Sequence, residues 1–361
     1  MDRSIVIVTR NMLAGGAERV IAQLANYFVK QGIDVKIVTL DDEKMFYDIN
    51  SQIEMIAIGK KSTNRLLDKW KRYSEVRRIV DCLKPDVVLS MPEDIGIYVI
   101  LALLGCRIPV YVSERNNPWV MPNVKVTRLL RRLMYPFAKG LIFQTDTAKS
   151  FFPKNIQKKS VVIGNPIDSD RIPQKYSGKR RKVVVGAGRL EAQKNFSLLI
   201  AAFAEFSKIY QDYELVIYGE GSMRRQLEEE IAMYKLEKKV FLPGRKSNLL
   251  ELVNDCSMFV LSSDYEGMPN VLLEAMCMGM PVISTDCPSG GPRELIKNME
   301  NGILVPVNGK DEIIKAMSYL TDEDISRRFS ENALMIRSRL TDSQIFEKWF
   351  TYLFKSSRSG K

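Results

Sequence analysis

Short apolar runs alternate with longer amphipathic segments along this chain of 361 residues. The first run, Ser4–Thr9, leads through a glycine turn, Ala14–Glu18, into a segment of helical periodicity, Arg19–Lys30. Continuous Val- and Ile-rich runs are typical of strands buried on both faces of a parallel sheet. The alternation therefore predicts a doubly wound α/β fold. The strands expected in the first half are Ser4–Thr9, Asp34–Leu40, Val87–Ser90, Val110–Ser113 and Leu141–Gln144.

The same order of elements restarts near Lys182. The strands expected there are Lys182–Gly186, Glu214–Tyr218, Val240–Leu242, Met258–Leu261 and Pro281–Ser284, with helices at Phe196–Tyr210, Met223–Tyr234 and Val271–Met278. A single hydrophobic core rarely grows beyond roughly 250–300 residues, so we expect two domains. Sheets of this kind bind ligands outside the carboxyl ends of their strands. Two Rossmann-like domains facing each other across a cleft would therefore share one binding site.

The domain boundaries follow from this repetition. We assign residues 1–165 to an N-terminal Rossmann-like domain and residues 180–340 to a C-terminal one. Residues 164–182 are rich in Asp, Pro, Lys and Arg and are interpreted as the linker. The amphipathic segment 343–357 is expected to form a helix that packs back on the N-terminal domain.

The positive charge of the chain is uneven. The net charge is +11, and residues 1–170 hold 26 Lys and Arg against 18 Asp and Glu, whereas the remainder holds 28 against 25. Such an excess in the first half favours anionic partners. The chain has no histidine, which excludes a histidine base or triad. Its five cysteines form no CxxC pair, which fits a reduced cytosolic protein without a structural zinc site.

The sharpest chemical signal is the segment Glu266–Glu274, which follows the strand ending at Leu261. Gly267 permits a tight turn, and Pro269 suits the first turn of a helix. The N-terminus of that helix would present free N–H groups and a partial positive charge, which together bind phosphate. Carboxylates beside it suit sugar hydroxyls, because they are strong hydrogen-bond acceptors.

Two further glycine-rich turns follow predicted strands. Gly186–Leu190 contains Gly188 and Arg189, and Lys194 comes shortly afterwards. Two cations in one loop suit a diphosphate leaving group, particularly where no metal is present. The other turn, Gly15-Gly16, lies in the opposite domain. Each turn alone is better explained as a loop or helix cap, whereas three at corresponding strand ends favour a ligand site.

With these motifs the chain resembles family 4 of the retaining glycosyltransferases, which have the GT-B architecture. The resemblance covers nearly the whole chain and is most specific in its second half. Among bacterial members it is most similar to enzymes that extend lipid-linked oligosaccharides, O-antigen or capsule. The matching segments are Gly15–Glu18, Gly164–Asp168, Gly188–Leu190, Lys194-Asn195, Tyr218–Gly221, Phe241–Gly244, Glu266 with Glu274, and Ser289–Glu294.

The resemblance implies a role for each matching residue. Arg189 and Lys194 would hold the donor diphosphate, Glu266 the donor sugar and Glu274 the nucleotide ribose. The donor-binding set it implies is Gly15, Gly16, Gly188, Gly244, Arg245, Gly267, Met268, Pro269, Asn270 and Glu274. The family needs no metal, and no DxD-type motif follows a strand here. A UDP-sugar is the expected donor of a hexose or N-acetylhexosamine.

One departure concerns the loop after the strand Val110–Ser113. Many relatives have a histidine there that faces the donor sugar, whereas this chain has Glu114 and Arg115. Arg115 either contacts an acceptor or donor oxygen or only pairs with a neighbouring carboxylate. A double displacement would need a carboxylate behind the anomeric carbon. Since the resemblance assigns Glu266 to sugar binding, we expect the acceptor to attack on the face of the sugar from which the diphosphate leaves. Glu114 and Arg115 are expected in the acceptor or sugar pocket.

The basic residues of the first half indicate an anionic surface as a partner. Lys60–Lys84 holds nine basic and three acidic residues, and Lys125–Lys139 holds five basic and no acidic ones. We expect their apolar stripes to pack on the N-terminal sheet and their basic faces to meet anionic lipid or an acceptor pyrophosphate. The set predicted to contact the membrane is Lys69, Arg72, Arg131 and Arg132. The protein is thus expected in the cytoplasm, on the inner face of the cell membrane, with an undecaprenyl-diphosphate-linked glycan as acceptor.

Other functions are compatible with parts of the pattern. A soluble acceptor or a different lipid would suit the same fold. A nucleic-acid-binding protein would explain the charge but not the Glu266 and Glu274 pair, and no nucleic-acid motif is present. A nucleotide-sugar epimerase of this fold would rely on histidines, which the chain lacks. An inactive scaffold is disfavoured by the presence of Arg189 and Lys194.

Overall fold

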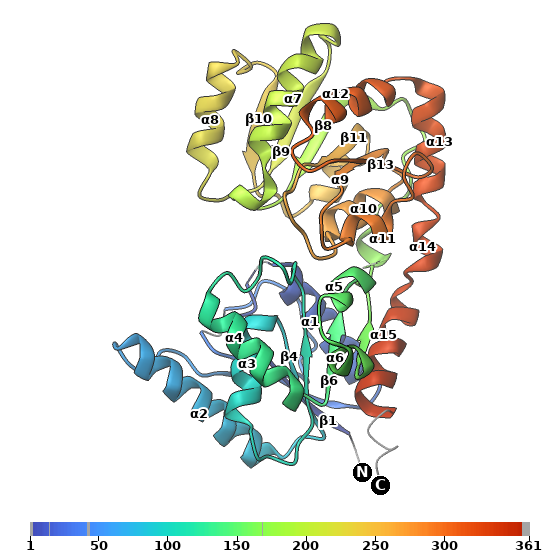
Figure 1. Ribbon diagram of the computed structural model, residues 1–361. Helices are drawn as coiled ribbons and strands as arrows, with labels where there is room; N and C mark the ends of the chain where they lie inside the picture. The colour runs from blue at the N-terminus through green and yellow to red at the C-terminus, as the bar shows by residue number, and fades with distance from the viewer. Residues whose placement is uncertain (1–2, 14, 42–43, 168, 356–361) are drawn as a thin grey trace. The chain divides into compact units, whose positions relative to one another are not determined.

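The computed structural model describes residues 3–13, 15–41, 44–167 and 169–355. The chain divides into two compact units, Met1–Pro166 with Asp342–Lys361, and Ile167–Thr341. The first passage between them, at residues 166 and 167, lies inside the segment interpreted as the linker, and the chain returns to the first unit at Asp342. Each unit is built around its own parallel sheet (Figure 1). The doubly wound α/β class predicted from the apolar runs is confirmed in both.

The N-terminal unit holds a seven-stranded parallel sheet in the order β3-β2-β1-β4-β5-β6-β7. Its strands are β1 Ser4–Thr9, β2 Asp34–Thr39, β3 Glu54–Ala57, β4 Val87–Ser90, β5 Val110–Ser113, β6 Gly140–Phe143 and β7 Ser160–Val162. Its helices are α1 Gly16–Lys30, α2 Arg65–Leu83, α3 Glu93–Ala102, α4 Lys125–Met134, α5 Asp146–Ser150 and α6 Lys154–Lys158. The central strands are buried along their whole length, as continuous Val and Ile runs require.

The C-terminal unit holds a six-stranded parallel sheet in the order β10-β9-β8-β11-β12-β13. Its strands are β8 Arg181–Ala187, β9 Glu214–Tyr218, β10 Val240–Gly244, β11 Cys256–Leu261, β12 Val282–Thr285 and β13 Ile303–Val305. Its helices are α7 Phe196–Ile209, α8 Arg224–Met233, α9 Leu249–Val253, α10 Asn270–Cys277, α11 Gly291–Leu295, α12 Lys310–Tyr319, α13 Glu323–Ala333 and α14 Ile336–Arg339. β8 and β11 lie at the centre, and the loops that follow them carry the motifs singled out above.

The C-terminal helix α15, Asp342–Phe350, and the π-helical turn Thr351–Lys355 pack on the N-terminal unit. Phe346 stacks on Tyr27 of α1 with ring centroids 4.9 Å apart. The Tyr352 hydroxyl donates to the carbonyl oxygens of Leu141 and Lys159. Leu141 lies in β6, and Lys159 comes directly before the neighbouring strand β7. The last helix therefore closes one face of the first sheet, although more than 300 residues separate Tyr27 from Phe346.

Two predicted helix starts were wrong in detail. α1 begins at Gly16, with Gly15 as its N-cap, and not at Arg19. Glu18 lies in its first turn, where a carboxylate is favoured by the helix dipole. α10 begins at Asn270 with Pro269 as its N-cap, so Pro269 stands just outside the helix that it was expected to open.

The apolar stripe predicted for α2 packs only in part. Val76 and Val80 are fully buried, but Leu66 is 79% exposed and Trp70 is 69% exposed. The interior of the unit therefore covers the second half of the helix alone. The expectation that the whole stripe packs on the sheet was wrong for its first turns.

α4 has two apolar faces rather than one. Leu130 and Met134 pack against the core of the N-terminal unit. A second row remains exposed: Val126 by 64%, Leu129 by 58% and Leu133 by 52%. The prediction that the apolar residues of this segment pack on the sheet was wrong for that row.

Two of the four residues predicted to contact the membrane are held inside the N-terminal unit. Arg131 is 4% exposed and pairs with Glu114. Arg72 is paired with Asp68 and Asp41, both at 2.7 Å. Arg72 is compensated by its two carboxylates and Arg131 is enclosed in the interior, so the membrane prediction was wrong for both. Among the described residues, no helix combines the length and apolar character needed to cross a bilayer.

Candidate active site

Two loops of the C-terminal unit lie side by side because the strands before them are paired. β8 and β11 are neighbours, so residues 188–195 and 262–267 leave the sheet at the same carboxyl edge. Gln193 joins the loops twice: its carbonyl accepts from the Asp264 N–H at 2.9 Å, and its side chain donates to the Tyr265 carbonyl at 2.8 Å. The two strongest sequence motifs thus form one continuous structure.

Lys194 and Glu266 meet within this structure. Their Nζ and Oε1 atoms are 2.5 Å apart, and the two side chains are only 12% and 9% exposed. Ser263 donates its hydroxyl proton to the same Oε1 at 2.7 Å. The Ser289 hydroxyl donates to the Glu266 carbonyl, which fixes the backbone of the loop. A cation and a carboxylate are therefore held together at the carboxyl edge of the sheet.

Arg189 lies on the same loop as Lys194 but is exposed. Its Nη2 lies 3.5 Å from Oε1 of Gln193, a long contact that leaves the guanidinium free to turn. The structure thus brings Arg189 and Lys194 to one loop, with Lys194 directed to Glu266 and Arg189 to solvent. An anion arriving here would find one fixed cation and one adaptable cation.

The glycines at this edge allow backbones to approach each other. A Cβ on Gly219 would lie 1.8 Å from the Gly188 carbonyl oxygen, and one on Gly291 would lie 1.6 Å from that of Gly267. Gly188 and Gly219 also have φ values of 154° and 152°, which favour glycine. These contacts between neighbouring loops explain part of the glycine pattern that was interpreted as close approach to a ligand.

The remaining residues predicted to bind the donor surround the start of α10. Pro269 caps the helix, with buried Met268 before it and Asn270 after it. Glu274 lies one turn further on and lines a small cavity together with Leu249.

The predicted base-binding turn lies close by. Gly244 ends β10 with a φ of 80°, Arg245 follows it and is exposed, and α9 begins four residues later at Leu249. The structure therefore brings Glu274 to the helix that follows this turn.

The glycine turn of the N-terminal unit is fixed by a tyrosine. The Tyr47 hydroxyl donates to the Gly15 carbonyl at 2.8 Å and accepts from the Gly15 N–H at 3.2 Å. Gly16, the first residue of α1, is exposed. Gly15, the N-cap residue, has no side chain to cap the helix, and the carboxylate of Glu18 lies beside it.

Glu114 and Arg115 are adjacent in sequence but have different partners. Glu114 is 2% exposed and contacts the Tyr135 hydroxyl at 2.5 Å and Arg131 at 3.4 Å. Burial is the largest influence on this carboxyl and raises its pKa to about 8. Glu114 thus belongs to the interior of the unit, and the structure does not bring it to the loop surface with Arg115.

Arg115 lies at the carboxyl edge of the N-terminal sheet and is 8% exposed. Its Nη2 donates to Oδ1 of Asn165, which also accepts from Gln144 at 2.7 Å, and its N–H donates to Glu93 at 3.1 Å. Within the described residues its Nη1 is buried without a hydrogen-bond partner. Burial lowers the pKa of Arg115 to about 10, against the opposing effect of Glu93 and Glu18. Such a guanidinium is suited to a polar or anionic ligand atom.

Sequence reasoning missed the residues that hold the site together. Gln193 and Ser263 were not identified, although each lies within three residues of a predicted site residue. Glu93 and Gln144 were missed because only the fold brings them to Arg115. In the described part of the chain, no group of three or more Cys, Asp or Glu side chains is placed to hold a metal ion.

The comparisons with known proteins agree with this architecture. Sucrose-phosphate synthase from Thermosynechococcus elongatus superposes with a TM-score of 0.85 at 16% identity, covering 99% of this chain and 100% of that structure. Two Rossmann-like units, each with a parallel sheet, form the GT-B fold of glycosyltransferases. The chain belongs to the glycosyltransferase family with an N-terminal family 4 domain and a C-terminal group 1 domain. Residues 14–171 match the model described as Glycosyltransferase Family 4, and residues 168–334 match that of Glycosyl transferases group 1.

Similar curated proteins span almost the same length. The chain is 28% identical over 355 residues to the Campylobacter jejuni GalNAc-α-(1→4)-GalNAc-α-(1→3)-diNAcBac-PP-undecaprenol α-1,4-N-acetyl-D-galactosaminyltransferase, with 97% of each chain covered. It is 29% identical over 347 residues to the N-acetylgalactosamine-N,N'-diacetylbacillosaminyl-diphospho-undecaprenol 4-α-N-acetylgalactosaminyltransferase of the same organism, with 91% of this chain and 93% of that protein covered.

Proposed function

We propose that this glycosyltransferase is a retaining enzyme that moves a hexose or N-acetylhexosamine from a UDP-sugar to a hydroxyl of an undecaprenyl-diphosphate-linked glycan. The observation that carries the proposal is the joined pair of loops in which Lys194 meets Glu266 at 2.5 Å. The two Campylobacter jejuni transferases, whose names give such acceptors, support the acceptor class. The choice of UDP rests on the resemblance to family 4.

The arrangement suits departure of a diphosphate. Lys194 is fixed by Glu266, and Arg189 on the same loop is exposed and adaptable. Fixed cations stabilise the negative charge that develops on the leaving group. The departing phosphate oxygen would take the proton of the acceptor hydroxyl, so that attack and departure occur on one face of the sugar. Among the described residues, both hydrogen bonds to the Glu266 carboxylate reach Oε1, which leaves Oε2 to accept from a sugar hydroxyl.

The proposed reaction needs no metal ion. Lys194 and Arg189 provide the positive charge that a divalent cation supplies in other phosphoryl and glycosyl transfers. We assign the sugar and ribose contacts to Glu266 and Glu274, and the acceptor to the N-terminal unit. Arg115 is proposed to contact a substrate oxygen there, whereas Glu114 supports the loop from inside.

A direct transfer assay tests this function. Purified protein would be incubated with UDP-N-acetylhexosamines or UDP-hexoses and an undecaprenyl-diphosphate-linked oligosaccharide, with and without excess EDTA. We expect transfer in both conditions and a product with the anomeric configuration of the donor, read by NMR couplings. Inversion would refute the retaining mechanism, and EDTA-sensitive activity restored by magnesium or manganese would refute metal independence. Absence of transfer to any lipid-linked glycan would refute the acceptor class.

We further propose that the N-terminal unit holds the enzyme at an anionic membrane surface. The exposed row of α4 continues through Phe137, which is 63% exposed, so the row repeats at intervals of three and four residues along one helix face. Exposed Lys125, Arg132 and Lys139 lie in the same segment. Apolar residues beside basic ones on an exposed helix are typical of helices that lie in the membrane interface.

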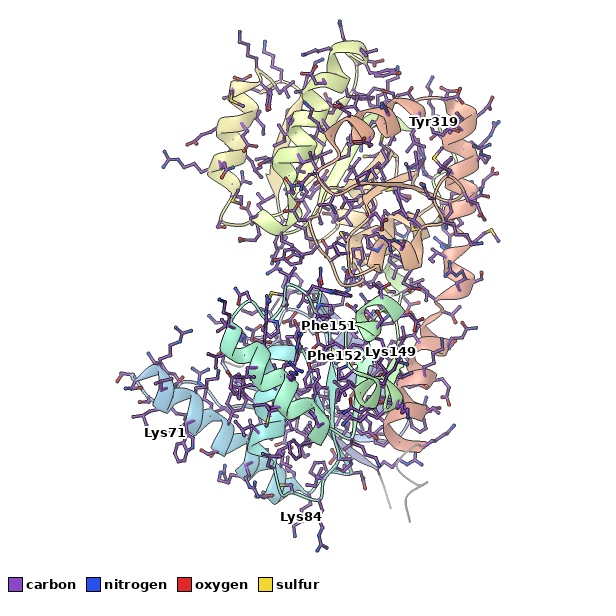
Figure 2. All side chains as sticks on the ribbon, viewed as in Figure 1. Lys71, Lys84, Lys149, Phe151, Phe152 and Tyr319 are labelled. Atoms are coloured by element: carbon purple, nitrogen blue, oxygen red, sulfur yellow. The ribbon has the colours of Figure 1, made fainter. Side chains whose placement is uncertain are left out.

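α2 adds a second element of the same kind. Leu66 and Trp70 are largely exposed beside Lys69 and Lys71, which are also exposed. Figure 2 shows Lys71 on this helix. Large apolar side chains that are exposed together often mark an interaction surface, whereas single exposed ones are common on any protein. Because a lipid-linked acceptor lies at the bilayer, such a surface would bring enzyme and acceptor together.

A further inference from the structure

Trp119 and Phe151 form an exposed aromatic pair at the carboxyl edge of the N-terminal sheet. Their ring centroids are 5.1 Å apart with planes at 70°, and the side chains are 43% and 38% exposed. Trp119 lies in the loop that follows β5. Phe151, labelled in Figure 2, is the C-cap residue of α5, which follows β6. β5 and β6 are neighbours in the sheet, so both residues belong to the edge where α/β sheets bind ligands.

The loop that carries Trp119 is held rigidly from α4. Arg128 donates to the carbonyl oxygens of Val120 and Pro122, both at 2.6 Å. Arg131 donates to the carbonyl oxygens of Met121 at 2.8 Å and Pro118 at 3.0 Å. Two arginines therefore bind four backbone carbonyl groups of the loop, one before Trp119 and three after it.

The other side of the pair is fixed as well. Asn117 is 1% exposed, and its side-chain oxygen accepts from the backbone N–H of Trp119 at 3.0 Å. The Arg131 guanidinium lies over the rings of Phe151 and Phe152, 5.1 Å from each centroid. The interior of the unit thus orders the backbone at Trp119 and the ring of Phe151, while both aromatic side chains stay partly in solvent. Exposed aromatic side chains on an ordered loop are a usual form of recognition surface.

We infer that Trp119 and Phe151 are a stacking platform for the sugar rings of the acceptor glycan. The apolar C–H face of a pyranose is attracted to the electron-rich face of an aromatic ring, and the indole N–H can donate to a hydroxyl. The same loop also holds Arg115, whose Nη1 is buried without a partner among the described residues. A ligand here is therefore offered apolar ring faces and the indole N–H as a polar donor, which suits a carbohydrate better than an acyl chain. This inference rests on the proposed function.

Binding of a soluble glycan tests the platform apart from catalysis. The probe is an α-1,4-linked N-acetylgalactosamine trisaccharide without lipid, observed by saturation-transfer NMR. We expect signal with the unaltered protein and with Trp119→Phe, and loss of signal with Trp119→Leu, which keeps an apolar side chain against Phe151 but removes the aromatic face. Tyr319→Ala is a matched control, because Tyr319 is also exposed and packs edge-on against Phe329, but it ends α12 in the other unit.

Kinetics on the lipid-linked acceptor give a second readout. We expect Trp119→Leu to raise KM for the glycan acceptor roughly tenfold, the loss expected when an aromatic stacking contact is removed, with kcat retained. Trp119→Phe should stay close to the unaltered protein. If the protein transfers sugar and Trp119→Leu leaves both KM and trisaccharide binding unchanged, the platform is refuted while the proposed function stands. If the unaltered protein transfers no sugar to lipid-linked glycans, the proposed function fails instead.

A membrane role for Trp119 is the competing result. With Trp70→Phe as background, Trp119 is the exposed tryptophan that remains, since Trp349 is fully buried. Emission that shifts to the blue on anionic vesicles but is unchanged by the trisaccharide would overturn the inference. Emission that changes with the trisaccharide in the absence of vesicles supports it.

Discussion

Lys194 and Glu266, 72 residues apart in sequence, form an ion pair of 2.5 Å between two loops of the C-terminal unit. Each loop comes from a different central strand, so the pair joins the ends of two strands that are neighbours in the sheet. A cation that is already held by a carboxylate keeps its position when a substrate arrives. Such preorganised charge is worth most where water is partly excluded.

Replacing Lys194 with methionine should lower turnover by about 100-fold or more, the effect of removing one donor that stabilises a developing anion. Methionine keeps the length of the side chain and removes its charge. Because the change leaves the Glu266 carboxylate without its cation, the variant should also be less stable. Turnover is measured at saturating donor, and stability by thermal melting.

The double variant Lys194→Met with Glu266→Gln separates the two effects. It removes the unpaired carboxylate, so its melting temperature should recover while its turnover stays low. Recovery of turnover in the double variant would mean that Lys194 serves only to neutralise Glu266. Arg189→Ala, which breaks no buried pair, should lower turnover without a large change in melting temperature.

Replacing Glu266 and replacing Glu274 should weaken the binding of different ligands. Glu274 lies on α10 and lines a cavity with Leu249, away from the contact between Lys194 and Glu266. Glu274→Gln is therefore expected to weaken binding of UDP itself, whereas Glu266→Gln should leave UDP binding nearly intact and weaken sugar-dependent binding and turnover. Calorimetric titration with UDP and with the UDP-sugar distinguishes them. The opposite pattern would mean that the two roles are reversed.

The sequence was sufficient to predict the central strands of both sheets, but not the edge strands β3, β7 and β13 or the fate of its charges. Buried parallel strands must be continuous apolar runs, so Val87–Ser90 and Val110–Ser113 were predicted with the bounds that the structure shows. A basic residue, by contrast, looks the same in sequence whether it is solvated or paired. The partner of Arg131 is Glu114, 17 residues before it, and one partner of Arg72 is Asp41, 31 residues before it. Only the fold shows that these two charges are internal.

The same reasoning applies to the candidate site. Arg189, Lys194, Glu266 and Glu274 could be named from motifs, because their spacing along the chain follows strand ends and one helix turn. Gln193 could not, because its role depends on the pairing of β8 with β11, which places the Tyr265 carbonyl within reach of its side chain. Contacts between loops of different strands are set by the sheet and leave no local pattern.

The buried Glu114 should give the protein a pH-dependent stability. Its folded pKa is raised to about 8 from an ordinary value of 4.5, so the folded state holds a proton that the unfolded chain releases between these values. The stability from this group is therefore fully present below about pH 4.5 and is lost as the pH rises to about 8. Denaturant unfolding of the unaltered protein and of Glu114→Gln across this range tests the prediction. The unaltered protein should lose unfolding free energy relative to Glu114→Gln as the pH rises from about 4.5 to about 8.

Arg131→Met provides the complementary test of the same interior group. It removes the donor to the Met121 and Pro118 carbonyls, so we expect the folded state to lose about 1–3 kcal/mol for each buried carbonyl left unsatisfied. Arg132→Met, at the exposed neighbouring position, is the control and should change stability by less than about 0.5 kcal/mol. Equal stabilities for the two variants would contradict the assignment of Arg131 to the interior.

Binding to membranes should have a charged and an apolar component. Each Lys or Arg near an anionic surface contributes about 1 kcal/mol, and this attraction is screened over about 8 Å at physiological ionic strength. Lys125, Arg132 and Lys139 are exposed in the segment that also exposes Leu129 and Leu133. We therefore expect strong binding to phosphatidylglycerol vesicles at low salt and a weaker remainder at high salt, measured by vesicle sedimentation.

The two components can be removed separately. Replacing Lys125, Arg132 and Lys139 with glutamine should abolish most binding at low salt, whereas replacing Leu129 and Leu133 with serine should abolish the remainder at high salt. Glutamine at Lys208, Lys235 and Lys238, exposed lysines of the C-terminal unit, is the control of equal charge and should leave vesicle binding unchanged. UDP binding should be normal in every variant, because none of these residues lies in the loops that hold Lys194 and Glu266. If the unaltered protein does not bind anionic vesicles at low salt, the membrane surface is refuted and a soluble acceptor becomes the better proposal.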